Sequence, residues 1–213
     1  MLVLGLDTSE TPGRVALLDE AGLAVERVLS DALRNAECLV PTIEALLTDS
    51  GRTRDELDRI CVNLGPGSFT GLRIGLATAK GMAQAGSIEL VGVDGTAAFR
   101  ERAPGERRAC VAIASRRDLA YVRWFSEARP RTETVLMHVS ELVERLRGET
   151  RPTCVVGTAA RRVVEQIGQG APAFLGPDAA LEPSALGVAR IGLRLSAVRL
   201  HALEPTYVEP VLT

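Results

Sequence analysis

The order of the expected secondary-structure elements repeats once along the chain, and this repeat constrains the fold more than any other feature. Three strand-like stretches are followed by helices that alternate with strands. The first copy is expected at residues 2–7, 14–19, 23–29, 35–50, 59–64, 70–85, 88–93 and 95–102. The second is expected at residues 109–114, 120–125, 132–136, 140–147, 153–156, 158–167 and 184–200.

Two copies of a βββαβα unit predict an α/β protein with two similar subdomains, each a mixed sheet flanked by helices. The turn residues at 103–105, Ala-Pro-Gly, indicate a boundary between the copies. The N-terminal subdomain is therefore expected at residues 1–102 and the C-terminal subdomain at residues 103–213. In an alternative arrangement, the C-terminal helix packs back on the first subdomain.

Composition argues against direct nucleic-acid binding as the main activity. The chain has 25 Lys and Arg against 27 Asp and Glu, a net charge of −2, and only 3% aromatic residues. A protein that neutralises many phosphates usually carries a basic excess, and base stacking needs aromatic side chains. The arginine pairs are therefore interpreted as solvated surface: Arg107-Arg108, Arg116-Arg117 and Arg161-Arg162.

No metal site, disulfide, leader or membrane span is expected. His138 and His201 stand alone, without a second ligand at helical spacing. The N-terminus has no basic residue before Arg14 and is interrupted by Asp7, so the protein is expected to be cytoplasmic. Four cysteines are scattered singly beside Val or Leu and are expected to be buried free thiols: Cys38, Cys61, Cys110 and Cys154.

The least ordinary segment is a glycine-rich turn between an expected strand and an expected helix. A strand, a turn and a helix N-terminus can aim backbone N–H groups at an anion, but the G-x-G-x-x-x-G spacing differs by one residue from the dinucleotide fingerprint. The alternative is a tight turn with Ser68 or Thr70 as the helix cap. This signature loop consists of Gly65, Pro66, Gly67, Ser68, Phe69, Thr70 and Gly71.

Two expected helices carry stripes that could face a partner. Gly71, Gly75, Ala79 and Ala83 recur every fourth residue and form a smooth ridge that would let another helix approach closely. Either the stripes cover the sheet, or they form an apolar face for a partner. The candidate partner-binding residues are Leu39, Ile43, Leu46, Leu72, Arg73, Leu76, Ala79 and Met82.

Four segments resemble motifs of the bacterial TsaB (YeaZ) family, and the resemblance covers nearly the whole chain. The run GPGSFTGLRIG at residues 65–75 resembles the family signature, and LDTS at 6–9 resembles its opening motif. AECLVP at 36–41 resembles the first-helix motif, and PTYV at 205–208 resembles the C-terminal tail.

This resemblance implies an actin-like fold of the ribonuclease H-like class, shared with Hsp70 and sugar kinases. It also implies a noncatalytic subunit for making threonylcarbamoyladenosine on tRNA, without a cofactor of its own. The implied partners are a TsaD-type transferase, bound as a heterodimer, and a TsaE-type ATPase. A homodimer would compete for the same surface, and tRNA would be contacted only through the complex.

The chain departs from the family pattern at three positions. Asn35 stands where many relatives have His, and acidic residues of the family are replaced by Ala114 and Leu119. The signature loop is unaffected, and the changes at Ala114 and Leu119 concern functions carried by the second subdomain.

The alternative hypothesis is an enzyme of the same fold, either an ATPase or kinase or a peptidase. Asp7 would suit a nucleotide site, but the turn after it has no glycine until Gly13, and Glu10 would repel a triphosphate. A metallopeptidase would need at least three ligands, and a serine or cysteine nucleophile would need a neighbouring base.

Overall fold

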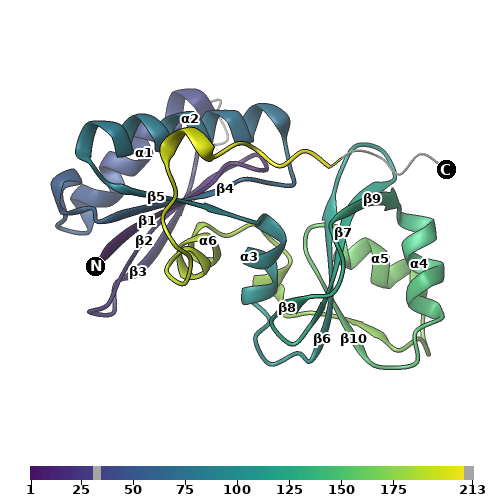
Figure 1. The fold of residues 1–213 in the computed structure, drawn as a ribbon. Helices are drawn as coiled ribbons and strands as arrows, with labels where there is room; N and C mark the ends of the chain where they lie inside the picture. Colours follow the sequence, from purple (N-terminus) through teal and green to yellow (C-terminus); the bar gives the residue numbers. More distant parts are fainter. Residues whose placement is uncertain (31–34, 209–213) are drawn as a thin grey trace. The chain divides into compact units, whose positions relative to one another are not determined.

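The computed structural model describes residues 1–30 and 35–208, and it divides the chain into two compact units. Unit 1 is Met1–Ala98 together with Pro183–Thr206, and unit 2 is built on Phe99–Glu182 (Figure 1). The first division falls after Ala98, four residues before the predicted boundary after residue 102. The chain also returns to unit 1 at Pro183, as in the alternative in which the C-terminal helix packs on the first subdomain.

Unit 1 contains a five-stranded mixed sheet in the order β3-β2-β1-β4-β5. The first three strands form an antiparallel meander, whereas β1, β4 and β5 run parallel. The strands are β1 (Leu2–Asp7), β2 (Arg14–Asp19), β3 (Ala24–Val28), β4 (Arg59–Asn63) and β5 (Glu89–Val93). The helices are α1 (Asn35–Asp49), η1 (Arg54–Glu56), α2 (Phe69–Gly86), α3 (Gly95–Glu101), α6 (Ala185–Gly192) and η3 (Leu200–Ala202), with α3 crossing the boundary at Ala98.

Helices cover both faces of this sheet, which explains why every residue of β1 is buried (Figure 1). Side chains alternate between the faces of a strand. Leu4 and Leu6 therefore pack with α1 and α2, whereas Val3 packs with Val188 and Ala189 of α6. Gly5 also lies on the α6 side, where a Cβ atom would stand 2.2 Å from the backbone oxygen of Ala185.

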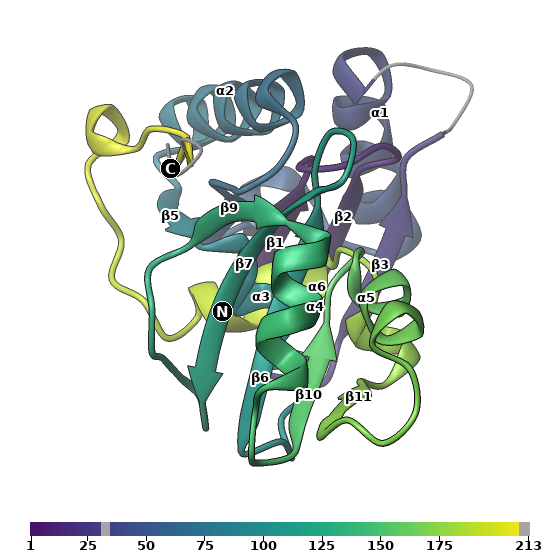
Figure 2. The same ribbon diagram turned by 90° about the vertical axis from the view of Figure 1, so that its right-hand side faces the viewer.

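Unit 2 repeats the arrangement, with a mixed sheet in the order β11-β10-β6-β7-β8 and β9 paired to β7. Figure 2 shows α4 and α5 in front of this sheet, and their apolar residues form one core with Ala112 and Val155. The strands are β6 (Arg108–Ala114), β7 (Leu119–Ser126), β8 (Arg129–Pro130), β9 (Val135–His138), β10 (Thr153–Val156) and β11 (Ala173–Leu175). The helices are α4 (Val139–Arg147), α5 (Ala160–Ile167) and η2 (Asp178–Ala180). The predicted fold class is confirmed.

The final helix is much shorter than predicted, because α6 ends at Gly192 instead of reaching residue 200. The guanidinium of Arg59 on β4 donates to the carbonyl oxygens of Gly192 at 2.9 Å and Leu195 at 3.1 Å. The Gly192 carbonyl also accepts from the N–H of Leu195 at 3.3 Å, so a side chain of the sheet and a last tight turn together end the helix. The chain then passes β5, where the N–H of Val198 donates to the oxygen of Leu90 at 3.2 Å.

The four cysteines are buried and free, as predicted. Burial raises the pKa of the Cys61 thiol to about 12 and that of Cys154 to about 11, because a thiolate loses its hydration inside the protein. The thiols of Cys61 and Cys154 are therefore protonated at neutral pH. Among the helices that the structure describes, none has both the length and the apolar character needed to cross a membrane.

Replacing Arg59 should destabilise unit 1 more than replacing its ion-pair partner. Arg59→Met removes the side-chain donor from two carbonyls, of which that of Gly192 keeps the N–H of Leu195, at a cost of about 1–3 kcal/mol of unfolding free energy. Glu89→Gln removes only the charge of a carboxylate that is 52% exposed, and should cost about 1 kcal/mol or less. Urea unfolding of the two variants measures the difference, and equal losses would contradict this role of Arg59.

Candidate functional site

The signature loop lies at the carboxyl ends of β1, β4 and β5, the edge at which open α/β sheets usually bind ligands. The loop leaves β4 through Gly65, whose φ of +119° favours glycine. The N–H of Gly65 donates to the side-chain oxygen of Asn63 at 2.8 Å, and its carbonyl accepts from the N–H of Gly95 at 2.8 Å. These two hydrogen bonds tie the loop to the end of β4 and to the start of α3, directly after β5.

Asp7, the acidic residue expected at a nucleotide site, is enclosed in this edge and only 1% exposed. One of its carboxylate oxygens accepts from the backbone N–H of Ser9 at 3.1 Å and from the Ser9 hydroxyl at 2.6 Å. The same oxygen accepts from the side-chain amide of Asn63 at 3.0 Å. Asp7 therefore links the ends of β1 and β4 and does not present its carboxylate to a solvent-borne ligand.

The signature glycines allow the N-terminus of α2 to approach the Thr8–Ser9 turn. A Cβ atom at Gly71 would lie 2.0 Å from the carbonyl oxygen of Thr8, and one at Gly67 would lie 2.6 Å from that of Ser9. The Thr8 hydroxyl donates to the carbonyl of Gly71 at 2.7 Å, and the N–H of Ser68 donates to the carbonyl of Ser9 at 2.7 Å. The glycine ridge was predicted to receive another helix, whereas its first residues receive this turn.

The first turn of α2 is capped from within. The hydroxyl of Ser68 accepts from the N–H of Gly71 at 3.2 Å, so Ser68 and not Thr70 is the N-cap. The side chain thereby uses one of the N–H groups that an anion would need. The tight-turn interpretation of the signature loop fits this geometry better than an anion site.

The C-terminal motif packs against the same loop. The N–H of Thr206 donates to the carbonyl of Leu64 at 2.7 Å, and its own carbonyl lies 2.9 Å from where a Cβ of Gly65 would stand. Three motifs that are far apart in the sequence therefore meet around one loop. This convergence was not visible in any single motif.

The apolar stripes on α1 and α2 are not a solvent-exposed face, which corrects their assignment as partner-binding side chains. They are buried because α1 and α2 cover the sheet, and the spacing that brings apolar residues to one side of a helix serves that purpose here. The buried residues are Leu39, Ile43, Leu46, Leu72, Leu76, Ala79 and Met82. Arg73 is the one candidate of the eight that is exposed.

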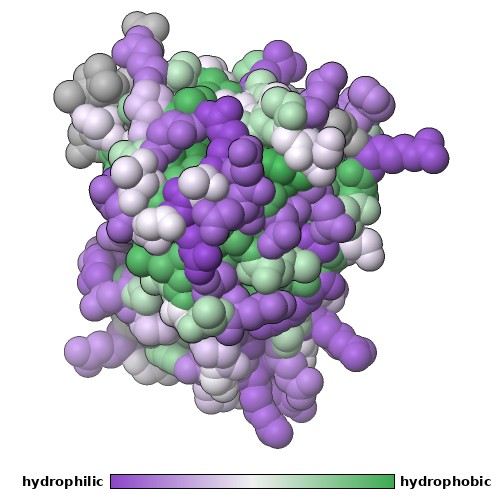
Figure 3. Space-filling model, turned by 90° about the vertical axis from the view of Figure 1, so that its left-hand side faces the viewer, coloured by the Kyte–Doolittle hydropathy of each residue, from purple (hydrophilic) through white to green (hydrophobic). Residues whose placement is uncertain are grey.

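The outer side of α2 carries a different row of residues at the same four-residue spacing. Phe69 is 53% exposed, and the guanidinium of Arg73 lies 4.0 Å from the centre of its ring. Ala77 and Gly81 continue this outer ridge, and a Cβ atom at Gly81 would meet nothing within 4 Å. On α1, Val40 is also exposed. The face of the molecule drawn in Figure 3 interleaves hydrophilic and hydrophobic side chains.

Comparison with known proteins shows the family. The family model described as TsaD: tRNA N6-adenosine threonylcarbamoyltransferase matches residues 31–154, more than half of the 213 residues. The chain belongs to this family. Its resemblance to the TsaB (YeaZ) proteins is likewise confirmed.

The relatives differ in how much of the chain they match. The tRNA threonylcarbamoyladenosine biosynthesis protein TsaB of Bacillus subtilis is 26% identical over 97% of this chain and 93% of its own length. The structure of YeaZ from Pseudomonas aeruginosa is 27% identical, with a TM-score of 0.79 over 97% of this chain and 99% of that one. An uncharacterized Mycobacterium tuberculosis protein is 36% identical over 57% of this chain, and the chain spans 58% of that protein.

Two departures from the family pattern lie together in unit 2. Ala114 ends β6 and is exposed, and its N–H donates to the hydroxyl oxygen of Thr158 at 2.9 Å. Leu119 begins β7 and pairs with His138 of β9. Asn35 begins α1, and its side chain lies outside the described residues. In the described part of the chain, no three His, Cys, Asp or Glu side chains gather as metal ligands do.

Gly71→Ala should destabilise the protein, although alanine normally favours a helix. A methyl group at this position meets the Thr8 carbonyl, so either α2 or the turn must move, at a cost of about 1–3 kcal/mol. Gly81→Ala is the matched control in the same helix, and with open space around it should stabilise by about 0.5–1 kcal/mol. Thermal unfolding measures both, and a stabilising Gly71→Ala would refute the proposed close approach.

Proposed function

We propose that the chain is a noncatalytic subunit for the biosynthesis of threonylcarbamoyladenosine on tRNA. The observation that carries this proposal is the enclosure of Asp7 within the TsaB-type motifs. The family signature is used to hold the strand ends together, and the one acid suited to a nucleotide site is occupied by Ser9 and Asn63. The family match and the TsaB relatives are the basis for assigning the chain to threonylcarbamoyladenosine biosynthesis.

The proposed partner is a TsaD-type transferase, with a TsaE-type ATPase acting on the pair and tRNA bound through the complex. The outer ridge of α2, consisting of Phe69, Arg73, Ala77 and Gly81, is the surface we assign to the transferase. Exposed Phe69 and Val40 provide apolar area, and the small residues Ala77 and Gly81 let another helix come close. A second copy of the chain could use the same ridge, so a homodimer would compete with the heterodimer.

Ala77→Arg should abolish association with the transferase and leave the isolated chain folded. Its side chain reaches water in the monomer, but burying the unpaired charge against a partner costs several kcal/mol. A penalty of ~4 kcal/mol weakens binding about a thousandfold. Analytical ultracentrifugation with the transferase, together with thermal unfolding of the variant, measures both effects.

Two arginine substitutions serve as controls for this experiment. Ala179→Arg places the same side chain on the exposed part of η2 and should leave both folding and association unchanged. Ala79→Arg, two residues along α2, should unfold the chain because Ala79 is fully buried. A folded Ala77→Arg variant that associates at wild-type strength would remove the outer ridge from the interface.

The purified chain should not hydrolyse ATP above background. Asp7→Asn should lower stability, because a neutral amide oxygen is a weaker acceptor for the donors of Ser9 and Asn63, and should leave the ATPase signal where it was. A phosphate-release assay and thermal unfolding test the two statements. An ATPase activity that Asp7→Asn eliminates would restore the kinase-like alternative.

A further inference from the structure

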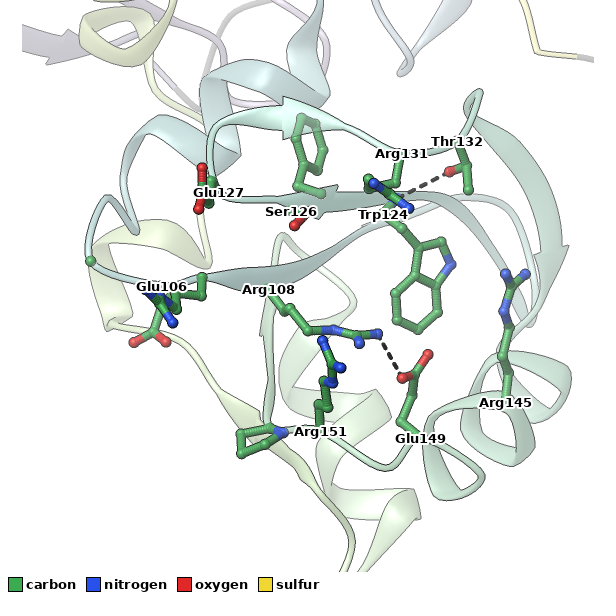
Figure 4. Close-up of a pocket in the computed structure, with 14 residues that line it drawn as sticks. Glu106, Arg108, Trp124, Ser126, Glu127, Arg131, Thr132, Arg145, Glu149 and Arg151 are labelled. Carbon is green, nitrogen blue, oxygen red and sulfur yellow. Dashed lines mark hydrogen bonds and ion pairs between the residues drawn. The ribbon is translucent and has the colours of Figure 1, made fainter.

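Unit 2 contains a large hollow on the side of its sheet formed by β6 and β7 (Figure 4). Its volume is about 1030 Å³, and its walls come from β6, β7, the segment after β8, the end of α4 and the loop before β10. All lining residues lie between Gly105 and Pro152, so the hollow belongs to one unit. Five arginines line it: Arg107, Arg108, Arg131, Arg145 and Arg151.

The hollow has an excess of positive charge. Three glutamates also line it, so the balance is 5 − 3 = +2. Glu149 is paired with Arg108 at 2.6 Å, and Figure 4 shows Glu106 and Glu127 at the end away from Trp124. The positive charge is therefore concentrated around Trp124.

Three of the arginines have no acidic partner. Among residues 1–30 and 35–208, the side chains of Arg107, Arg131 and Arg151 form no ion pair. All three are exposed at the rim or wall of the hollow. Their charges are therefore available to an anionic ligand without breaking an existing contact.

Trp124 supplies an independent indication of a ligand. Its side chain is only 7% exposed. Its indole nitrogen is buried and, within the described part of the chain, has no hydrogen-bond partner. A buried indole N–H normally finds an acceptor. Figure 4 shows this nitrogen on the side of the ring nearest Arg145, whose guanidinium lies 5.0 Å from the ring centre. An anionic oxygen at this place would accept hydrogen bonds from both side chains.

We propose that this hollow binds the phosphate backbone of RNA. Arginines spread over four segments suit a chain of phosphates that passes across them better than a single enclosed anion. The volume is at the upper end of the range for small-molecule sites, roughly 300–1,000 Å³. The choice of RNA rests on the proposed function in tRNA modification. It assigns unit 2 a direct tRNA contact within the assembled complex, as an alternative to the interpretation of Arg107-Arg108 as solvated surface.

The net charge of −2 is compatible with this proposal, because phosphate contacts depend on local charge within about a Debye length, ~8–10 Å at physiological salt. The isolated chain should bind RNA weakly, and the hollow should add to the affinity of the assembled complex. Trp124 is the only tryptophan of the chain, so its fluorescence reports occupation of the hollow directly.

The test uses the full chain titrated with a tRNA transcript at several salt concentrations, followed by Trp124 fluorescence. Emission should change on binding, and the double variant R131A/R151A should bind about tenfold more weakly at low salt. Its slope of log affinity against log salt should be smaller by about 1 to 2, since each lost phosphate contact removes about one counterion. R131K/R151K retains the charges and should stay close to wild type.

The control R116A/R161A removes the same charge from exposed positions of unit 2 that do not line the hollow. It should keep the affinity and slope of the wild type. The proposal fails if R131A/R151A binds tRNA as the wild type does, or if the control loses as much. It also fails if ATP changes the emission and R131A/R151A abolishes that response while tRNA binding persists, because the hollow would then be a nucleotide site.

This experiment is independent of the partner assay. It reads RNA binding by the chain alone, whereas Ala77→Arg reads association with the transferase. A chain that binds the transferase but not RNA refutes the hollow and leaves the proposed function standing. A chain that binds RNA through the hollow but does not bind the transferase supports the hollow and refutes the proposed partnership.

Discussion

The backbone contact between the start of α2 and the Thr8–Ser9 turn determines the arrangement of unit 1. The carbonyl of Thr8 occupies the space that a side chain at Gly71 would need, and the hydrogen bonds of Thr8 and Ser68 fasten the two segments from both sides. Close backbone approach of this kind tolerates only glycine. Because α2 is fixed at this end, its apolar side packs on the sheet and its outer ridge is exposed to solvent.

The same contact explains why the acid at the carboxyl edge of this sheet, Asp7, is not accessible to a ligand. In open α/β sheets, the carboxyl edge is a natural ligand position because several strand ends and helix N-termini meet there. Here the edge is filled by the protein itself. Asp7 and Asn63 bond to each other, Ser68 caps the helix, and the tail through Thr206 adds a further backbone contact. These hydrogen bonds link the three motifs within unit 1.

Much of the fold follows from local pattern, because the repeated order of strands and helices is encoded in apolar spacing. What could not be predicted depends on contacts between distant segments. The end of α6 is set by Arg59 on β4, and the partner of the glycine ridge is a turn that precedes it by more than fifty residues. The buried side of α2 could not be separated from an interface by periodicity, since both have the same spacing. The arginines of the hollow come from four segments, so only the folded chain reveals their proximity.

The return of Pro183–Thr206 to unit 1 has a consequence for synthesis of the protein. A ribosome delivers residues 1–98 first, but the face of the sheet that carries Val3, Cys61 and Val91 packs with Val188 and Ala189 of α6, which are synthesised later. Residues Phe99–Glu182, the main part of unit 2, are therefore synthesised before α6 can cover that face. Domains that fold as they emerge usually do so from the N-terminus. In this chain the first sheet lacks part of its apolar cover until α6 has been synthesised, after the main part of unit 2.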